Sequence, residues 1–347
     1  MARVLVTGAT GFIGAHVVRA LLARGDDVRV TVRASSPLDA LEGLDVERVT
    51  ADITDRAAMR RAVRGIERAF HVAGTNNLRM GPEPLLRANA QGTHVVLEAC
   101  LAGGVQRVVH TSSVAAIGPA RPGGALDERH VRAGPLGIPY ADAKHAAEVE
   151  ALRVAARGLD VVVACPAHVL GAGDERRSST EIVRRFLLPR IPAYVDGGIN
   201  IVDVQDVAAG LLLCDERGVP GERYIFGTRN YTWQRLFGEL QRISGVEGPV
   251  MRVPRSVALA LAEGSARVPG FPALGSVEEI RAAGQWWTCK STKARRELGW
   301  TTRPHEDTVE ATVRFHEERL GDRLLRVGRR QPLALRMAGR AVRTVVR

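Results

Sequence analysis

Cysteine is scarce in this 347-residue chain, and the four cysteines that occur have no paired spacing. Their scatter argues against a disulfide framework and a zinc site, and it fits a reducing compartment. His110 and His168 have no carboxylate or second histidine placed for metal binding, so we predict no metal. We expect each cysteine to be a small buried apolar residue. They are Cys100, Cys165, Cys214 and Cys289.

Long apolar runs are also missing. No uninterrupted stretch approaches the roughly 20 residues that a membrane-spanning helix needs. The chain begins almost at once with a strand and a glycine-rich loop, so we expect no signal peptide. Hydrophobic residues make up 45% and charged residues 25% of the chain, which is typical of a globular protein with a large core. These features predict a cytoplasmic protein.

Segments with the pattern of strands and helices alternate over the first half of the chain. This alternation predicts an α/β fold of the Rossmann type, a doubly wound parallel sheet with helices on both faces. Strands are expected at residues 3–6, 28–32, 46–50, 69–73, 107–111 and 161–165, and helices at 16–24, 55–64 and 85–103.

The alternation weakens from about Asp174. We therefore expect an NADP-binding Rossmann domain over residues 1–173 and a smaller C-terminal substrate-binding lobe over 174–318. The chain of this lobe returns to the Rossmann core near 199–215, and a basic tail follows over 319–347. Ligands of open α/β sheets bind beyond the carboxyl ends of the strands. The long interruptions rich in Gly and Pro are therefore candidates for the pocket wall, at 78–83, 117–139 and 171–198.

A glycine-rich loop follows the first strand. Its three glycines let a tight turn open a helix whose N-terminus can lie against a pyrophosphate. Glycine triplets also occur in ordinary turns, but the strand before, the helix after and the second strand beyond all fit a dinucleotide site. The predicted cofactor-binding residues of this loop are Gly8, Thr10, Gly11, Phe12, Ile13 and Gly14.

The end of the second strand lacks the acidic residue that pairs with the ribose 2′-hydroxyl of NAD. Arg33 stands there instead, and its guanidinium can pair with a 2′-phosphate. The alternative for Arg33 is a solvated surface arginine. The missing acid favours NADP(H), with NAD(H) as the alternative. After the third strand, Asp52 and Ile53 are expected at the adenine edge, although Asp52 can equally cap a turn or a helix.

Tyr140 and Lys144 lie four residues apart on an expected helix, so they share one face. A tyrosine with a pKa near 10 is a poor acid or base at neutral pH, and a neighbouring ammonium lowers that pKa. Ser113, the second of a serine pair after the fifth strand, can hydrogen-bond a substrate oxygen. Tyr-xxx-Lys spacings alone are mostly structural. Together with the serine pair and the glycine loop, however, they predict a proton-transfer site for hydride chemistry.

These motifs together resemble the extended branch of the short-chain dehydrogenase/reductase superfamily, the NAD-dependent epimerase/dehydratase proteins. The resemblance covers about residues 1–316. Within the branch, the chain looks most similar to the dihydroflavonol-4-reductase and 3β-hydroxysteroid-dehydrogenase type. Around residues 192–196 it also resembles the hopanoid-associated sugar epimerase group. The matching segments are 7–14, 71–74, 89–93, 111–114, 140–144, 166–171, 204–208 and 293–300.

The resemblance implies roles for particular residues. Ser113, Tyr140 and Lys144 would form the catalytic triad, and Tyr140 and Lys144 would also contact the cofactor. A small-molecule substrate and, by analogy with other members, a homodimer are implied as well. Five further residues would lie by the cofactor, support the site or contact the nicotinamide end: Ala73, Gly74, Asn89, Pro166 and His168.

The triad does not decide between reduction and epimerisation, because sugar-nucleotide epimerases share it. Those enzymes commonly grip the nucleotide diphosphate with an arginine, where this chain has Ile199, and Asp203 replaces the family histidine. Asp203 either contacts substrate or caps the helix near Asp206. The sugar-nucleotide interpretation stays open because other arginines can substitute, namely Arg176, Arg177, Arg184 or Arg185.

We predict an NADP(H)-dependent oxidoreductase that reduces a ketone or aldehyde of an apolar or amphipathic molecule, with Tyr140 as the proton donor. Two sets of apolar residues, 186–188 with Ile191 and the tryptophan pair 286–287, either line an apolar pocket or belong to the core. A redox-neutral NDP-sugar epimerase or dehydratase is the alternative. A non-catalytic NADP-sensing protein is the second alternative, although such proteins typically lose the tyrosine or the lysine.

Positive charge is concentrated at the C-terminus. Residues 320–347 contain eight arginines against one aspartate, which is +7 of the net charge of +11. Arg336, Arg340, Arg343 and Arg347 recur on one stripe, as in a basic amphipathic helix on an anionic membrane surface. The alternatives are peripheral membrane contact through 320–347 and a solvated C-terminus. No aromatic platform accompanies the arginines, so we expect no nucleic-acid partner.

Overall fold

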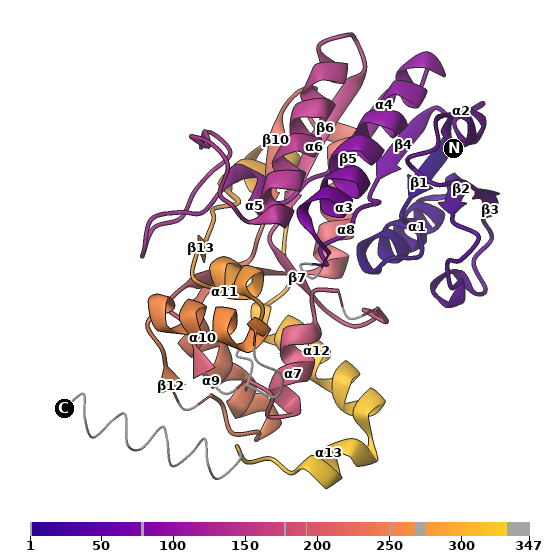
Figure 1. Cartoon of the computed structure of the whole chain (residues 1–347). Helices are drawn as coiled ribbons and strands as arrows, with labels where there is room; N and C mark the ends of the chain where they lie inside the picture. Colours follow the sequence, from indigo (N-terminus) through magenta and orange to yellow (C-terminus); the bar gives the residue numbers. More distant parts are fainter. Residues whose placement is uncertain are drawn as a thin grey trace.

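Seven parallel strands form the central sheet of the computed structural model, which describes residues 2–77, 80–176, 178–191, 193–249, 251–267 and 275–331. Their order is β10-β6-β5-β4-β1-β2-β3 (Figure 1). The chain winds outward from β1 in both directions, so the predicted doubly wound α/β fold is confirmed. The bounds are β1 (Arg3–Thr7), β2 (Asp27–Val32), β3 (Glu47–Thr50), β4 (Arg68–His71), β5 (Arg107–Thr111), β6 (Asp160–Pro166) and β10 (Arg223–Phe226).

Helices cover both faces of this sheet. Successive side chains of a strand point to opposite faces, and here both sets are apolar, so both faces must be shielded from water. In β1, Val4 and Val6 pack with α1 and α8, whereas Leu5 packs on the other face with α2, α4 and α6. Both faces are therefore apolar, as a parallel sheet requires. These helices are α1 (Phe12–Arg24), α2 (Arg56–Ala62), α4 (Gly92–Ala102), α6 (Pro139–Ala155) and α8 (Val204–Arg217).

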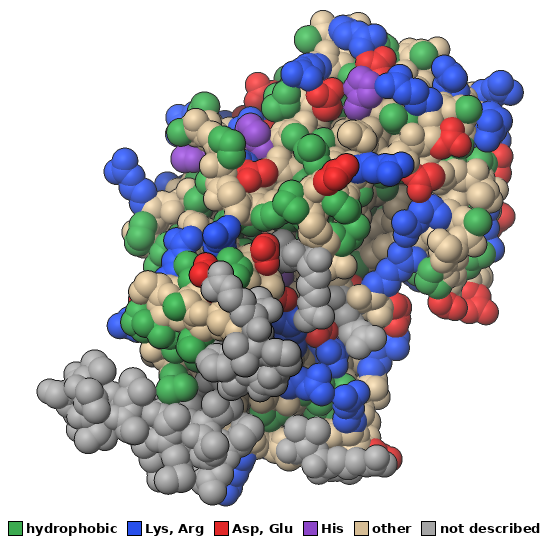
Figure 2. Space-filling model, in the orientation of Figure 1, with side chains coloured by type: hydrophobic (Ala, Val, Ile, Leu, Met, Phe, Trp, Pro, Cys, Tyr) green, Lys and Arg blue, Asp and Glu red, His purple; other side chains and the backbone are tan. Residues whose placement is uncertain are grey.

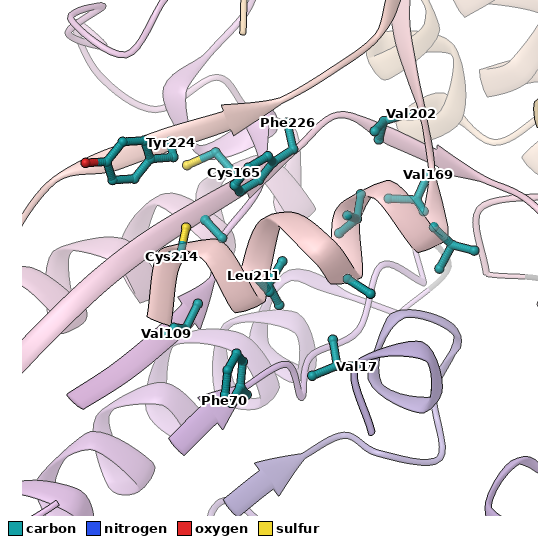
Figure 3. Packing of buried hydrophobic residues seen from close by; sticks show 14 of the residues in the cluster. Val17, Phe70, Val109, Cys165, Val169, Val202, Leu211, Cys214, Tyr224 and Phe226 are labelled. Carbon is teal, nitrogen blue, oxygen red and sulfur yellow. The ribbon is translucent and has the colours of Figure 1, made fainter. Parts of the chain in front are cut away.

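The four cysteines are buried and free, which confirms the expectation that they act as small core residues. Figure 3 shows α8 crossing the sheet, with Leu211 and Cys214 in the same apolar cluster as Val109 and Cys165. On the other face of the sheet, burial raises the pKa of Cys100 to about 12, so this thiol stays protonated and inert at neutral pH.

A second, smaller sheet belongs to the C-terminal lobe, below the central sheet in Figure 1. Its strands lie in the order β11-β9-β13, and β7 also pairs with β9. Because β7 directly follows β6, α8 directly follows β9 and β11 directly follows β10, three direct connections join the lobe to the central sheet. The bounds are β7 (His168–Leu170), β9 (Gly198–Asp203), β11 (Arg229–Thr232) and β13 (Trp286–Trp287), with a separate pair β8 (Ala193–Tyr194) and β12 (Met251–Arg252).

The structure differs from the sequence-based expectation in two segments. The stretch 171–198, expected as a loop, contains a helix that buries Val183, Phe186 and Leu187 in the core of the lobe. The single helix expected over 85–103 is interrupted by a π-helical turn. The remaining elements are η1 (Asp39–Leu41), α3 (Pro82–Leu86), η2 (Arg87–Gln91), α5 (Val114–Ile117), α7 (Glu181–Leu187), α9 (Trp233–Ser244), α10 (Arg255–Arg267), α11 (Val277–Ala283), η3 (Ala294–Leu298), α12 (His305–Leu320) and α13 (Asp322–Val327).

The basic tail is described only as far as residue 331. The predicted arginine stripe from Arg336 to Arg347 lies outside the described residues. Within the described part of the chain, no helix combines the length and the apolar character needed to cross a membrane.

Two histidines stack in the centre of the sheet. The rings of His71 in β4 and His110 in β5 are 5.4 Å apart between centroids, and both residues are buried. The ring nitrogens of His71 contact the hydroxyls of Thr7 at 2.8 Å and Thr93 at 2.9 Å. The ring nitrogens of His110 have no hydrogen-bond partner within the described residues. Burial lowers the pKa of His71 to about 3 and that of His110 well below its ordinary value.

We expect these histidines to destabilise the protein in acid. The unfolded chain binds protons on histidine below a pH of about 6.5, whereas the folded chain does not until the pH is far lower. Stability is therefore fully present above that pH and falls as the pH drops, for His71 by about 2 kcal/mol at pH 5. Urea unfolding at pH 7 and pH 5 measures this loss.

A variant pair isolates the contribution of the buried rings. His110→Leu removes one buried imidazole, so the difference in unfolding free energy between pH 7 and pH 5 becomes smaller. His94→Gln serves as the control, because His94 is a partly exposed residue beside Glu150. An unchanged pH dependence in His110→Leu would contradict the account.

Candidate active site

The loop between β1 and α1 is packed so tightly that two of its glycines, Gly8 and Gly14, cannot carry side chains. Gly8 has a φ of 74°, and a Cβ there would lie 2.6 Å from the backbone nitrogen of Ala73. A Cβ on Gly14 would lie 2.1 Å from the carbonyl oxygen of Gly8. Gly11, the residue before α1, has no side chain to cap the helix, and the first turn contains no acidic residue. The backbone N–H groups of this turn can therefore bind an anion such as a pyrophosphate.

The predicted proton-transfer residues meet at the carboxyl end of β5. Ser113 begins α5, and its Oγ accepts a hydrogen bond from the backbone N–H of Ala115 at 3.1 Å. The same hydroxyl contacts the phenol of Tyr140. One helical turn further along α6, the Nζ of Lys144 donates to the carbonyl oxygen of Thr111 at 2.9 Å. Strand β5 and helix α6 thus bring the three residues together.

Burial controls the charges of this group. Lys144 is only 7% exposed, and burial lowers its pKa to about 8. Burial likewise raises the pKa of Tyr140 above its ordinary value, while the hydrogen bond with Ser113 opposes this shift. The expectation that the Lys144 ammonium lowers the pKa of Tyr140 is therefore wrong, since burial outweighs the effects that lower this pKa. At neutral pH the phenol is protonated, which is the state of a proton donor.

Gly74 leaves space for the ammonium of Lys144, and Asn89 holds the neighbouring backbone. A Cβ on Gly74 would lie 2.7 Å from Oδ1 of Asn89 and 3.4 Å from Nζ of Lys144. The amide nitrogen of Asn89 donates to the carbonyl oxygens of Thr75 and Leu85, both at 3.0 Å. Asn89 lies in the π-helical turn η2. The turn therefore fixes the chain after β4 beside Lys144.

Glu148 is a residue of the site that the sequence analysis missed. It lies one turn after Lys144 on α6 and is 1% exposed. Its carboxylate accepts a hydrogen bond from Ser112 Oγ at 2.7 Å and pairs with Arg223 of β10 at 2.5 Å. Its i+4 spacing after Lys144 puts it on the same helix face, but this spacing alone does not distinguish it from an exposed helical residue.

Arg33 and Asp52 lie near each other at the ends of β2 and β3. Asp52 accepts hydrogen bonds from the backbone and hydroxyl of Thr54, which lower its pKa, and the charge of Arg33 adds to this effect. Asp52 therefore closes a turn, which was one of its two expected roles. Arg33 is exposed, and Ile53 packs against Gly92 at the start of α4.

The residues on the side of the C-terminal lobe have separate roles. Asp203 begins α8, accepting from the backbone N–H of Gln205 at 2.8 Å and pairing with Arg303 at 3.4 Å, so the structure supports its capping role. Pro166 ends β6 and His168 begins β7. Burial lowers the pKa of His168 to about 4, so its ring is neutral at neutral pH.

Four arginines were expected as possible replacements for the family arginine that binds a nucleotide diphosphate, and they have different surroundings. Arg184 and Arg185 pair with Glu181, and Arg185 also pairs with Glu279. Arg176 donates to the hydroxyl of Thr10 in the glycine loop at 3.0 Å. Arg177 lies outside the described residues. Ile199, at the position of the family arginine, is buried in β9.

An apolar wall stands beside Tyr140. Tyr140, Leu136 and Trp287 are partly buried, and all three pack against the same buried cluster, which contains Ile138. The indole nitrogen of Trp287 donates to the carbonyl oxygen of Ala282 at 2.8 Å, so its only polar atom is satisfied. The segment 186–188 is instead fully buried in the lobe. Of the two predicted apolar segments, the structure therefore places 287 at the site and 186–188 in the core.

The fold and this arrangement define an extended short-chain dehydrogenase/reductase. The model of the NAD-dependent epimerase/dehydratase family matches residues 4–227, and the chain belongs to this family. The predicted resemblance is therefore confirmed.

Three relatives extend over most of the chain. A protein of Synechocystis sp. named for dihydroflavonol 4-reductase is 38% identical over 85% of this chain and 88% of its own length. Sterol demethylase protein B of Methylococcus capsulatus is 36% identical over 85% and 92%. A 3β-hydroxysteroid dehydrogenase/Δ5→4-isomerase of Mycobacterium tuberculosis is 30% identical over 86% of each chain. The first and third bear out the predicted subgroup.

Solved structures show the same fold. The structure of gox2253 has a TM-score of 0.81 and 33% identity, covering 92% of this chain and 99% of its own. A nucleoside-diphosphate-sugar epimerase from Pseudomonas aeruginosa has a TM-score of 0.78 and 27% identity, covering 92% and 98%. A dTDP-glucose 4,6-dehydratase from Streptomyces venezuelae, solved with NAD bound, has a TM-score of 0.75 and 25% identity, covering 92% and 98%.

The family and the reductase and dehydrogenase relatives identify the chain as an enzyme, an NAD(P)-dependent oxidoreductase of the extended short-chain dehydrogenase/reductase type.

We expect Gly14→Ala to abolish high-affinity binding of NADH and NADPH, because the new methyl group would collide with the carbonyl oxygen of Gly8. Overpacking of this kind also costs about 1–3 kcal/mol of stability. Gly238→Ala is the matched control, since a Cβ in the middle of α9 meets no atom within 4 Å. Fluorescence titration with NADPH and thermal unfolding measure both effects. Wild-type NADPH affinity in Gly14→Ala would show that the glycine loop is not the binding site.

Proposed function

We propose that the protein is an NADP(H)-dependent reductase of a ketone or aldehyde carried on an apolar or amphipathic molecule. The observation that carries this proposal is the neutral phenol of Tyr140, held between Ser113 and the apolar wall. A proton donor beside apolar side chains suits an uncharged carbonyl substrate better than a sugar diphosphate.

The reaction follows from the positions of the side chains. The carbonyl oxygen of the substrate accepts hydrogen bonds from Ser113 Oγ and from the Tyr140 hydroxyl. The reduced nicotinamide, when bound, supplies the hydride that forms the new C–H bond at the carbonyl carbon. Tyr140 gives its proton to the oxygen, and the ammonium of Lys144 stabilises the phenolate that remains until solvent returns the proton.

Three contacts weigh against the sugar-nucleotide alternative. The position of the family arginine is a buried isoleucine, Ile199. Arg184 and Arg185 are paired with carboxylates, and Asp203 caps α8 and pairs with Arg303. The epimerase and dehydratase folds among the solved neighbours keep this alternative as the second candidate, and net oxidation of NADPH distinguishes the two.

We expect Tyr140→Phe to lower the rate of NADPH oxidation by about 10²- to 10⁴-fold, because the proton donor is removed while the cofactor site remains. Absorbance of NADPH is followed with purified protein across ketones, steroids, isoprenoid aldehydes and NDP-sugars. Tyr224→Phe is the control, since the Tyr224 hydroxyl accepts from the backbone of Val219 in the central sheet, away from the triad. Equal activity in wild type and Tyr140→Phe would overturn the mechanism.

The preference for NADP(H) rests on Arg33, which is exposed at the end of β2 where no acidic residue stands. Arg33→Ala is expected to weaken NADPH binding by about 10- to 100-fold, the contribution of one charge-assisted contact, and to leave NADH binding unchanged. Dissociation constants for the two cofactors give the ratio. A wild-type protein that binds NADH more tightly than NADPH would reverse the assigned preference.

A further inference from the structure

A loop of the C-terminal lobe reaches over the cofactor loop of the Rossmann sheet. It follows β7 and carries Arg176, whose guanidinium donates to Thr10 Oγ1 at 3.0 Å. Two residues further on, the carbonyl oxygen of Ser178 accepts from the amide of Asn76 at 3.2 Å. The loop therefore contacts both the glycine loop after β1 and the turn after β4, which lies against the glycine loop.

The loop is held in this position by a buried carboxylate. Asp174 is 1% exposed, and its two oxygens accept five hydrogen bonds of 2.8–3.0 Å from the backbone and hydroxyl groups of Ser178, Ser179 and Thr180. Gly173, at a φ of 96°, lets the chain pass close to α1, because a Cβ there would lie 3.1 Å from the ring of His16. The backbone that carries Arg176 is therefore held in place by these hydrogen bonds.

The charge of Arg176 is not neutralised. No carboxylate pairs with it within the described residues, because Asp174 is fully engaged in its own turn and Glu175 pairs with Arg319. It stands beside the N-terminus of α1, whose partial charge is also positive. Two positive groups side by side repel each other unless an anion lies between them. Figure 2 shows that Lys and Arg side chains gather where the upper and lower parts of this face meet.

We propose that Arg176 is a cofactor-binding residue that grips the pyrophosphate of NAD(P)(H) from the side of the substrate lobe, opposite the backbone N–H groups of α1. This proposal rests on the proposed function, since it assumes the cofactor site of the glycine loop. Arg176 then couples the lobe to cofactor binding, and it acts on both NADPH and NADH because both contain the pyrophosphate.

The test compares dissociation constants measured by fluorescence titration for NADPH, NADH and adenosine 2′-monophosphate. Arg176→Gln is expected to weaken NADPH and NADH by the same factor, about 10- to 100-fold, and to leave the monophosphate unchanged. Arg33→Ala, in contrast, weakens NADPH and the monophosphate and leaves NADH unchanged. Arg184→Gln is the matched control on α7, and equal melting temperatures establish that each variant is folded.

The outcomes separate this proposal from the proposed function. Unchanged cofactor affinity in Arg176→Gln overturns the assignment of Arg176, whether or not the enzyme reduces carbonyls. A higher KM for an NDP-sugar with unchanged NADPH affinity overturns it in favour of a grip on a substrate diphosphate. Failure of the wild-type protein to bind NADPH or NADH removes the proposed function itself.

Discussion

The structure of the site depends on one buried cation, the ammonium of Lys144. A buried ammonium is unstable unless its surroundings compensate the loss of water, and its lowered pKa is the measure of that cost. The carbonyl oxygen of Thr111 accepts a hydrogen bond from this ammonium, and the negative charge of Glu148 raises the pKa of Lys144 against the effect of burial. The neighbouring residues fit around it: Gly74 leaves space, and Asn89 fixes the chain that passes beside it.

The site requires the carboxyl end of β5 and the first turns of α6 to lie next to each other. Strand β5 delivers Thr111 and Ser113 at its carboxyl end, and α6 places Tyr140 and Lys144 one turn apart above them. Glu148 then links the same helix to the edge strand β10 through Arg223. A substitution at Glu148 would leave Arg223 and Ser112 without their partner, so the helix is positioned by a contact that stands outside the catalytic motif.

The sequence predicted the Rossmann half well because local signals and fold agree there. Strand segments such as 107–111 coincide with the observed strand, and the glycine loop opens α1 as expected. Motif spacing also predicted the grouping of Ser113, Tyr140 and Lys144. The contacts themselves required the fold, because Ser113 lies on the loop after β5 and the other two residues lie on α6.

The sequence could not predict features whose stability comes from distant residues. Glu148 looks like an exposed helical residue until Arg223 of β10 is placed beside it. The loop around Asp174 looks irregular, although a buried carboxylate orders it. Asp203 had two open roles, and only the neighbouring Arg303 and the start of α8 distinguish capping from substrate contact.

The proposed function makes one central chemical claim, that hydride passes from the cofactor to the substrate without returning. Incubation with NADPH deuterated at the transferred position of the nicotinamide tests this claim directly. Mass spectrometry of the product should show one deuterium on the carbinol carbon, with one NADP⁺ formed for each product. A parallel incubation with NAD(P)⁺ in place of NADPH tests the alternative. Inversion of a stereocentre there with no net formation of NAD(P)H, together with no deuterium transfer from NADPH, would contradict the account and establish an epimerase.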